Sequence, residues 1–385
     1  MNTIEQSFSV KFNYNIYFTS SLFAATNTVF EDFLKSQAVE NITPKIFFIV
    51  DEGVAKAHPN LVSQIQAYFK IYTTAKIITE ILVIPGGEVA KNDPSALDLI
   101  TEAVDRHGID RHSYIAAIGG GSVLDVAGYA SAVSHRGIKH IRIPTTVLSQ
   151  NDSGVGVKNG VNYKGKKNFL GTFAAPVAVF NDELFLKTLS DRDWRSGMSE
   201  AIKVALIKDA KFFSWIEEHA GALNKRDKET MNHLIHRCAE LHVQHISSGD
   251  PFEKGSSRPL DFGHWSAHKL EQLTNFTVLH GEAVALGIAL DTVYSVLSGH
   301  LSMDTSNKVV QLLLQLGFAI THPLLQFEDD ESQILNGLKE FREHLGGRLT
   351  IMLLREIGEG IEVHEMNTEL LKKAANYLLK FKATN

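Results

Sequence analysis

The sequence predicts a two-domain α/β protein, with a parallel-sheet domain over residues 1–189 and a mostly α-helical domain over residues 190–385. Two observations lead to this prediction. In the first half, short apolar runs alternate with longer amphipathic ones, which is typical of a parallel sheet covered by helices on both faces. After about Leu189 the strand pattern gives way to apolar residues at helical spacing.

Four strands are expected in the first domain, because each is a short apolar run next to glycine, proline or an acidic residue. They cover residues 45–51 (KIFFIVD), 81–87 (ILVIPGG), 114–121 (YIAAIGGG) and 140–146 (HIRIPTT). Residues 1–18 alternate like a pair of strands, and residues 349–354 (LTIMLL) form one late strand-like segment. Ligands of parallel sheets bind at the carboxyl ends of the strands, so we expect the first domain to bind its ligand there.

Composition excludes several classes of protein. At 385 residues the chain exceeds the size that one hydrophobic core usually supports, and 44% apolar with 21% charged residues is ordinary for a globular protein. The net charge of −6 argues against a nucleic-acid partner. No apolar run is long enough for a membrane span, and no secretory signal is evident. The single cysteine, Cys238, excludes an intrachain disulfide, so a cytoplasmic location is expected.

A glycine-rich segment, GGGSVLDVAG, indicates a nucleotide-binding loop. Gly119, Gly120 and Gly121 follow an expected strand and precede an expected helix. Glycines there let the backbone approach a diphosphate, and the helix N-terminus favours its negative charge. Because the segment is not GxGxxG, a simple turn is the alternative interpretation. Asp51 ends the first expected strand, where an acid can bind ribose hydroxyls, and Glu88 and Lys91 are candidates for contacting a second part of the nucleotide.

Glu200, His264 and His280 are candidate ligands for one divalent metal. Two imidazoles and a carboxylate are a common ligand set for catalytic zinc, because three protein ligands leave one coordination position open. His264 and His268 have i,i+4 spacing, but the HExxH pattern is absent, so we do not take both as ligands. With 17 histidines in the chain, a surface or core role for each remains the alternative.

Seven ordered motifs resemble the dehydroquinate synthase superfamily of sugar-phosphate cyclases. They are GGGSVLDVAG, RGIKHIRIPTT, NDSG, KGKKNFLG, GMSEAIK, FGHWSAH and HGEAVALG. The resemblance runs from about Asp51 to Gly287 and continues weakly to the C-terminus. It implies a Rossmann-like NAD-binding domain, a helical metal domain, a cleft between them and a homodimer.

The resemblance also implies roles for single residues. Glu200, His264 and His280 match the family's zinc ligands, with Co²⁺ as an alternative metal. Substrate-contacting positions are matched by Asp152, Lys158, Lys167, Asn168, Lys203 and His268. Arg136 matches an arginine that reaches the phosphate bound by a neighbouring subunit. NAD-contacting positions are matched by Gly120, Gly121, Asp125, Thr145, Thr146, Thr188 and Leu189. Taken alone, KGKKN would be a solvated surface loop.

The reaction that the resemblance implies needs NAD and zinc but no second redox substrate. NAD oxidises a ring hydroxyl held on zinc, phosphate leaves by β-elimination, and the hydride returns. The ring then opens, and an intramolecular aldol step closes the carbocycle. In this scheme Lys203 and Asp152 orient or shuttle hydroxyl protons, zinc acts as a Lewis acid, and the phosphate helps to remove the α-proton.

Departures from dehydroquinate synthase point to a different substrate. Asp261 stands where the synthases have asparagine, Ser257 where they have arginine, with Arg258 displaced by one, and His242 where a lysine is customary. These changes remove cations that would hold a substrate carboxylate, and Asp261 can accept hydrogen bonds from neutral hydroxyls. The runs RPLDFGHW and EFREHLGG look more like the sedoheptulose 7-phosphate cyclases, the 2-epi-5-epi-valiolone synthase group.

Three function classes remain open at this point. The first is a sugar-phosphate cyclase, with sedoheptulose 7-phosphate ahead of 3-deoxy-arabino-heptulosonate 7-phosphate, the substrate of 3-dehydroquinate synthase. The second is an oxidoreductase related to glycerol dehydrogenase, which shares the glycine loop. The third is a binding protein without catalysis, against which the complete ligand set argues, because a polar cluster without function costs stability.

Overall fold

The computed structural model describes residues 3–248, 250–252, 259–327, 332–344 and 348–381. The chain divides into two compact units. Unit 1 comprises Met1–Pro144 and Val157–Leu184, and unit 2 comprises Thr145–Gly156 and Phe185–Asn385. The segment 145–156 therefore joins the helical unit, whereas the sequence suggested one boundary after Leu189. One contact that holds this segment to the rest of unit 2 is a hydrogen bond of 2.8 Å from Nδ2 of Asn151 to the carbonyl oxygen of Gly197.

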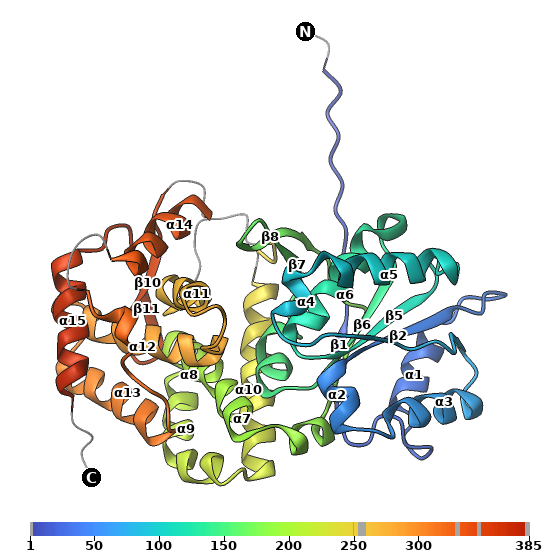
Figure 1. The fold of residues 1–385 in the computed structure, drawn as a ribbon, viewed down its shortest axis with the longest axis horizontal. Helices are drawn as coiled ribbons and strands as arrows, with labels where there is room; N and C mark the ends of the chain where they lie inside the picture. The colour runs from blue at the N-terminus through green and yellow to red at the C-terminus, as the bar shows by residue number, and fades with distance from the viewer. Residues whose placement is uncertain (1–2, 249, 253–258, 328–331, 345–347, 382–385) are drawn as a thin grey trace. The chain divides into compact units, whose positions relative to one another are not determined.

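Unit 1 is built on a seven-stranded sheet with the order β1-β9-β6-β5-β2-β3, in which β4 also pairs with β2 (Figure 1). Its strands are β1 (Asn15–Thr19), β2 (Lys45–Asp51), β3 (Lys76–Ile77), β4 (Leu82–Ile84), β5 (Tyr114–Gly119), β6 (Lys139–Pro144) and β9 (Ala178–Asp182). All pairs in this sheet are parallel. The parallel sheet and its four expected strands are thus confirmed. The expected N-terminal strand pair is wrong, because in the described part of residues 1–18 only the segment from Asn15 onward pairs, and it does so with β9.

The two faces of the sheet are covered by helices, as alternation along β2 requires. Phe47 and Ile49 belong to one core cluster, which they share with residues of α5 (Pro94–Arg106) and α6 (Gly121–Val133). Phe48 points to the opposite face, since successive strand side chains alternate. There it packs against Phe30 of α1 (Val29–Ser36) and Phe69 of α3 (Leu61–Ile71).

Unit 1 also contains an antiparallel hairpin that the sequence analysis did not anticipate. It consists of β7 (Lys158–Tyr163) and β8 (Lys166–Phe173). The two turn residues, Lys164 and Gly165, both have positive φ, at 48° and 76°. Such a two-residue turn matches the right-handed twist of the flanking strands. KGKKN is therefore a hairpin tip and not a loop.

Unit 2 is mostly helical, as expected. Its helices are α7 (Asp191–Ser196), α8 (Met198–Lys208), α9 (Ala210–Asn224), α10 (Lys228–Ser247), α11 (His264–Leu273), α12 (His280–Leu297), α13 (Met303–Gln315), α14 (Asn336–His344) and α15 (Thr368–Lys380). The late strand-like segment is confirmed as β10 (Ile351–Glu356), which forms a hairpin with β11 (Glu359–Val363).

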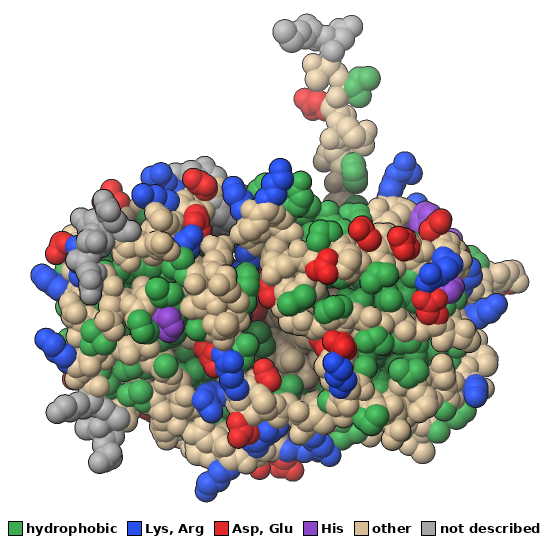
Figure 2. All heavy atoms as spheres, in the orientation of Figure 1, with side chains coloured by type: hydrophobic (Ala, Val, Ile, Leu, Met, Phe, Trp, Pro, Cys, Tyr) green, Lys and Arg blue, Asp and Glu red, His purple; other side chains and the backbone are tan. Residues whose placement is uncertain are grey.

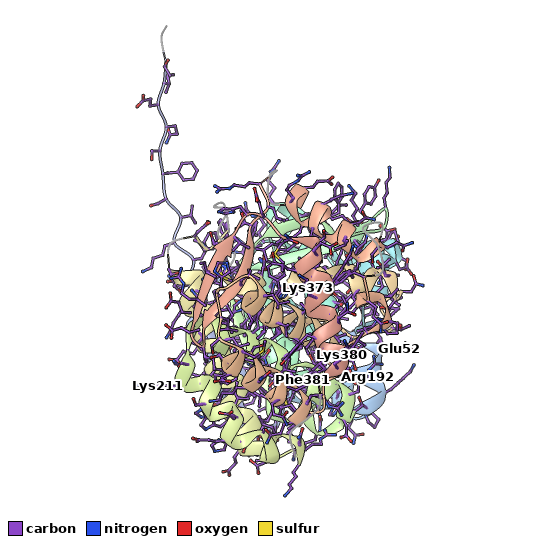
Figure 3. The ribbon with its side chains drawn as sticks, turned by 90° about the vertical axis from the view of Figure 1, so that its left-hand side faces the viewer. Glu52, Arg192, Lys211, Lys373, Lys380 and Phe381 are labelled. Atoms are coloured by element: carbon purple, nitrogen blue, oxygen red, sulfur yellow. The ribbon has the colours of Figure 1, made fainter. Side chains whose placement is uncertain are left out.

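The helices of unit 2 differ in how they are buried. α15 is amphipathic, with Leu371 and Leu378 buried and Lys373 and Lys380 exposed along it (Figure 3). α8 is instead buried from Met198 to Ile207 without interruption, so it forms the centre of the unit. Any polar side chain on α8 must therefore find its partners inside the protein. Among the described residues, no helix is both long and apolar enough to cross a membrane.

Candidate active site

Three side chains of unit 2 bring potential metal ligands together. Glu200 lies on α8, His264 is the first residue of α11, and His280 is the first residue of α12. The Oε1 atom of Glu200 lies 3.2 Å from Nε2 of His280 and 3.5 Å from Nε2 of His264. One ligand atom from each residue falls within 4.8 Å of the others. The carboxylate and the two imidazoles therefore face one point.

Each imidazole is oriented through its second nitrogen. Nδ1 of His264 lies 3.0 Å from the carbonyl oxygen of Phe262, and Nδ1 of His280 lies 3.1 Å from Oε2 of Glu271. Because a carbonyl and a carboxylate accept hydrogen bonds, each Nδ1 is the protonated nitrogen of a neutral ring, which leaves Nε2 as an acceptor. Three atoms with free lone pairs then converge, and none of them carries a proton to donate. A cation fits such a set, and two imidazoles with one carboxylate are ligands that suit zinc.

Lys203 stabilises the buried carboxylate of Glu200. Its ammonium contacts Oε2 of Glu200, one helical turn earlier on α8, leaving Oε1 toward the imidazoles. Burial acts to raise the pKa of Glu200, but the positive charge of Lys203 is the largest of the interactions that outweigh burial and lower this pKa well below its usual range. Burial acts in turn to lower the pKa of Lys203, and the charges of Glu200 and Asp152 outweigh it and raise that pKa. The pair is thus an ion pair at neutral pH.

Asp152 extends the charged cluster beyond Lys203. It lies in a short π-helical turn, η2 (Ser149–Ser153), and its Oδ1 is 2.9 Å from Nδ1 of His242 on α10. Burial and the charge of Glu200 act to raise the pKa of Asp152. Lys203 and His242 outweigh them, so the pKa lies below its ordinary value. Asp261 also acts electrostatically on Lys203. Lys203 and Asp152, two of the substrate-contacting residues expected from the sequence, therefore lie beside the candidate metal ligands.

His268 lies beside the two histidines that are candidate metal ligands. Its ring centroid is 5.3 Å from that of His264 and 6.0 Å from that of His280. It also forms a second group of potential ligand atoms with Glu271 and His280. That group shares His280 with the first one and includes the carboxylate that orients it. His268 therefore borders the ligand set without contributing the atom that faces Glu200.

The start of α11 is held by backbone geometry and by a buried acid. Gly263 has φ +76°, and a Cβ on it would lie 2.8 Å from the backbone nitrogen of Ile288 on α12, so glycine is required there. Asp291 of α12 accepts hydrogen bonds from Gly263 N at 3.2 Å and from Trp265 Nε1 at 2.9 Å. Burial raises the pKa of Asp291 to about 7. These contacts fix the residues on either side of His264.

The residues of the expected nucleotide loop lie at the ends of adjacent strands of unit 1. Gly119 ends β5 and α6 begins at Gly121, with no side-chain cap on its N-terminus. Asp51 ends β2 and accepts a hydrogen bond from Gly53 N at 2.7 Å, while burial raises its pKa. A Cβ on Gly86 would lie 2.5 Å from the Asp51 carboxylate. The glycine loop therefore presents backbone amides at the start of α6, and the glycines near Asp51 leave room beside its carboxylate. A dinucleotide requires both features at the ends of adjacent strands.

Lys91, Asp125 and Asn168 meet in unit 1. Nζ of Lys91 lies 2.8 Å from Oδ2 of Asp125 and contacts Oδ1 of Asn168. Glu88 accepts hydrogen bonds from Ser122 Oγ at 3.2 Å and from Asn162 Nδ2 at 2.6 Å. The structure therefore joins expected nucleotide-contacting residues to Asn168, an expected substrate-contacting residue.

The remaining expected residues are spread over both units. Lys158 begins β7 and Lys167 lies next to the hairpin turn, so the two lysines occupy opposite ends of that hairpin. Arg136 has φ 62° and lines a surface pocket with Asp110, Arg111, Val133 and His135. Thr145, Thr146, Thr188 and Leu189 all belong to unit 2. Thr146 and Ser149 bond through their hydroxyls at 2.8 Å, and the carbonyl of Leu189 accepts a bond from Arg226 at 2.8 Å.

Comparison with known proteins decides the family. Residues 81–196 match the family model for the 3-dehydroquinate synthase N-terminal domain, and residues 197–339 match the model for its C-terminal domain. The 3-dehydroquinate synthase of Halorhodospira halophila is 32% identical over 333 residues, which are 84% of this chain and 92% of that protein. The chain belongs to the 3-dehydroquinate synthase family.

Solved structures confirm the fold of this family. ValA, a 2-epi-5-epi-valiolone synthase from Streptomyces hygroscopicus subsp. jinggangensis 5008 with NAD⁺ and Zn²⁺ bound, aligns with a TM-score of 0.86 and 26% identity. The alignment covers 98% of this chain and 99% of that one. A 2-deoxy-scyllo-inosose synthase complexed with carbaglucose-6-phosphate, NAD⁺ and Co²⁺ aligns with a TM-score of 0.77 and 24% identity, over 94% and 96% of the two chains. The expected resemblance to sugar-phosphate cyclases is confirmed.

Two acidic residues that support the site of this 3-dehydroquinate synthase family member, Glu271 and Asp291, were not predicted from the sequence. Glu271 follows His264 by seven residues, so the two share one face of α11, and this spacing was a usable signal. The sequence indicates Asp291 less clearly. A buried indole such as that of Trp265 needs a hydrogen-bond acceptor, but the sequence does not show that Asp291 of α12 is that acceptor.

We expect Glu200→Ala, His264→Ala and His280→Ala each to remove tightly bound zinc and activity together, because each deletes a metal ligand. The loss of zinc affinity should exceed the roughly 100-fold that indirect changes reach. Elemental analysis of purified protein, with circular dichroism to confirm folding, measures this. His219→Ala, a histidine that stacks on Trp215, is the matched control and should retain zinc. Full activity in zinc-free His264→Ala would refute the assignment.

Glu271→Gln should weaken zinc binding about 10- to 100-fold without abolishing it, because the amide orients His280 less strongly than the carboxylate does. Competition with a chelator gives the affinity. Glu217→Gln removes a surface carboxylate that pairs with Lys308 at 2.9 Å, and it serves as the control. An unchanged zinc affinity in Glu271→Gln would show that the contact with His280 does not support the metal.

Proposed function

We propose that this protein is a sugar-phosphate cyclase that uses NAD and one divalent metal, Zn²⁺ with Co²⁺ as the alternative. The observation that carries the proposal is the convergence of Glu200, His264 and His280 beside Lys203 and Asp152 in unit 2. Membership of the 3-dehydroquinate synthase family supports it, and the ValA structure, which holds NAD⁺ and Zn²⁺, supports the same pair of cofactors.

The bound metal would act as a Lewis acid on a substrate hydroxyl, and NAD would accept and return a hydride. Lys203 is held protonated by two carboxylates, so it can donate a hydrogen bond to a substrate oxygen beside the metal ligands. Asp152 is held ionised by Lys203 and His242, so it can accept a hydrogen bond from a substrate hydroxyl. These two residues therefore supply one donor and one acceptor at the reacting hydroxyl.

The phosphate and NAD contacts complete the proposal. Lys158, Lys167 and Arg136 supply cations for a phosphate monoester, Arg136 across a homodimer, and Asn168 adds an amide. His268 borders the metal-ligand set, where it can contact the substrate. The proposed NAD contacts are Asp51, Glu88, Lys91, Gly119, Gly120, Gly121, Asp125, Thr145, Thr146, Thr188 and Leu189. We place the enzyme in the cytoplasm, with a sugar phosphate as its small-molecule partner.

Sedoheptulose 7-phosphate is the proposed substrate. Asp261 stands where a synthase has an amide, and its charge acts on Lys203. His242 stands where a cation is customary and is bound to Asp152, so it is engaged within the protein. A carboxylate on the substrate would face Asp261, whereas a neutral hydroxyl would donate to it. Ser257, Arg258 and part of the EFREHLGG run lie outside the described residues and add nothing further.

The alternative substrate is 3-deoxy-arabino-heptulosonate 7-phosphate, the substrate of 3-dehydroquinate synthase. The names of the curated relatives favour it, since the synthases of Halorhodospira halophila and Acinetobacter baumannii are 32% and 34% identical to this chain. The oxidoreductase alternative has less support. A probable glycerol dehydrogenase from Sinorhizobium meliloti shares 12% identity at a TM-score of 0.60, which shows a common fold alone.

We expect phosphate release without stoichiometric accumulation of NADH when the protein is incubated with NAD, zinc and the sugar phosphate. The reason is that the hydride taken from the substrate is returned before the ring closes, so net redox is zero. Parallel measurement of phosphate and of NADH absorbance tests this. Steady NADH formation from a simple polyol, without phosphate release, would instead identify an oxidoreductase.

Sedoheptulose 7-phosphate should have a kcat/KM about 10²-fold or more above that of the acidic heptulosonate phosphate, because a carboxylate facing Asp261 is repelled. Asp261→Asn should narrow this ratio about tenfold or more, since the amide removes the repulsion. Higher kcat/KM for the acidic substrate in the unmodified enzyme would refute the substrate assignment and leave the cyclase assignment intact. Arg258→Ala would then show whether that arginine binds the substrate carboxylate.

A further inference from the structure

The hairpin of β7 and β8 contains a bulge near its tip. Between two successive pairs of the strand register, β7 has one residue and β8 has three. The one residue is Asn162, and Asn168 is the middle residue of the three. Bulges redirect side chains and are common beside active sites. The pairs on either side of the bulge are Val161 with Leu170 and Tyr163 with Lys166.

Asn168 has a backbone conformation that few residues other than glycine adopt. Its φ is 53°, in the left-handed region. Asparagine tolerates this region better than most residues, but the conformation persists only where the surrounding structure holds it. Here Oδ1 of Asn162 accepts a hydrogen bond of 2.7 Å from the backbone nitrogen of Asn168. The side chain opposite the bulge therefore holds its central residue.

Asn162 is held in turn by α4 (Val89–Asn92) and by the residue before that helix. Its Nδ2 donates hydrogen bonds to Oε1 of Glu88 at 2.6 Å and to Oδ1 of Asn92 at 2.8 Å. The carboxylate can only accept and the backbone N–H of Asn168 can only donate, so these partners fix the orientation of the Asn162 amide. Glu88 also accepts a hydrogen bond from Ser122, so Asn162 connects the bulge to the residues around the glycine loop.

Lys91 orients the side-chain amide of Asn168. Its ammonium contacts Oδ1 of Asn168 and forms an ion pair of 2.8 Å with Asp125. Because an ammonium only donates hydrogen bonds, it takes the oxygen of the amide and leaves Nδ2 to donate to a ligand. Asn168 is exposed, and lysine or arginine side chains lie beside hydrophobic ones on the surface over β8 (Figure 2). Asn168 can therefore offer Nδ2 to an anionic oxygen that approaches the hairpin.

We propose that Asn162 is a positioning residue, which holds Asn168 in its left-handed conformation so that Nδ2 of Asn168 donates to the phosphate of the substrate. The inference rests on the proposed function, in which Asn168 contacts a sugar phosphate. Asn162 acts through Asn168, because its own amide is already bonded to Glu88, Asn92 and Asn168. The phosphate is present when the substrate binds, so loss of the positioning affects KM more than kcat.

Asn162→Ala is the first test, measured with sedoheptulose 7-phosphate, or with the acidic heptulosonate phosphate if the unmodified protein turns over that one. The KM should rise about tenfold, with kcat changed less than about threefold, because a hydrogen bond to a charged phosphate is misplaced in the bound substrate. Circular dichroism confirms that each variant folds. An unchanged KM, or a loss confined to kcat, would overturn the proposal.

Asn27→Ala is the matched control. Like Asn162, Asn27 is a half-buried asparagine of unit 1. Its Oδ1 accepts a hydrogen bond from the backbone nitrogen of Val29 at 3.1 Å, and its Nδ2 donates to Thr19 at 2.9 Å and to Ser20 at 3.1 Å. Asn27→Ala removes the same set of bonds elsewhere in the unit and should leave KM unchanged. An equal rise of KM in Asn27→Ala would show a general effect of stability and overturn the proposal.

A double-mutant cycle tests whether Asn162 acts through Asn168. Asn168→Ala removes the amide and should raise KM at least as much as Asn162→Ala does. The KM of the double variant should stay within about twofold of that of Asn168→Ala, because no amide is left to position. Effects that multiply in the double variant would overturn this proposal alone. An unchanged KM in Asn168→Ala would overturn it together with the substrate contact of Asn168, and a lack of phosphate release from both sugar phosphates in the unmodified protein would refute the proposed function itself.

Discussion

The buried carboxylate of Glu200 is the constraint on which unit 2 depends. α8 is enclosed from Met198 to Ile207, so this charge has no water to solvate it. An unpaired buried carboxylate costs several kcal/mol, and the surrounding helices supply the compensation. Lys203 neutralises one oxygen from the next turn of the same helix, and the imidazoles of His264 and His280 face the other. A cation at their meeting point would satisfy these three acceptors at once.

The positions of the two imidazoles follow from how their helices begin. His264 and His280 are each the first residue of a helix. Neighbouring residues hold the backbone at these helix starts as well as the imidazole rings. Glu271 reaches back from α11 to His280, while Asp291 reaches from α12 to Gly263 and Trp265 on either side of His264. α11 and α12 therefore each hold the ligand that the other presents. A change in either helix reaches both ligands, which makes the pair of helices one functional element.

Asp261 and His242 lie beside the charged cluster of the candidate active site. The candidate metal ligands and Lys203 lie within residues 197–339, and the glycine loop lies within residues 81–196, the two ranges that match the 3-dehydroquinate synthase family models. Asp261 acts electrostatically on Lys203, and His242 contacts Asp152. In the proposed function, these two residues set the choice of substrate without altering the candidate metal ligands or the nucleotide loop.

The sequence by itself determined the parallel sheet with its central strands, the helical second unit and the family, because each of these is recorded in local periodicity or in contiguous motifs. It proposed Glu200, His264 and His280 as one ligand set from residue chemistry and resemblance, and that assignment stays a prediction that the geometry supports. Tertiary structure decided what joins residues distant in the chain: the Glu271–His280 contact, the support of Gly263 by Asp291, and the attachment of 145–156 to the helical unit. It also showed the hairpin turn at Lys164–Gly165, and it showed that β1 begins at Asn15 and pairs with β9, since alternation favours a strand but does not identify the partner strand.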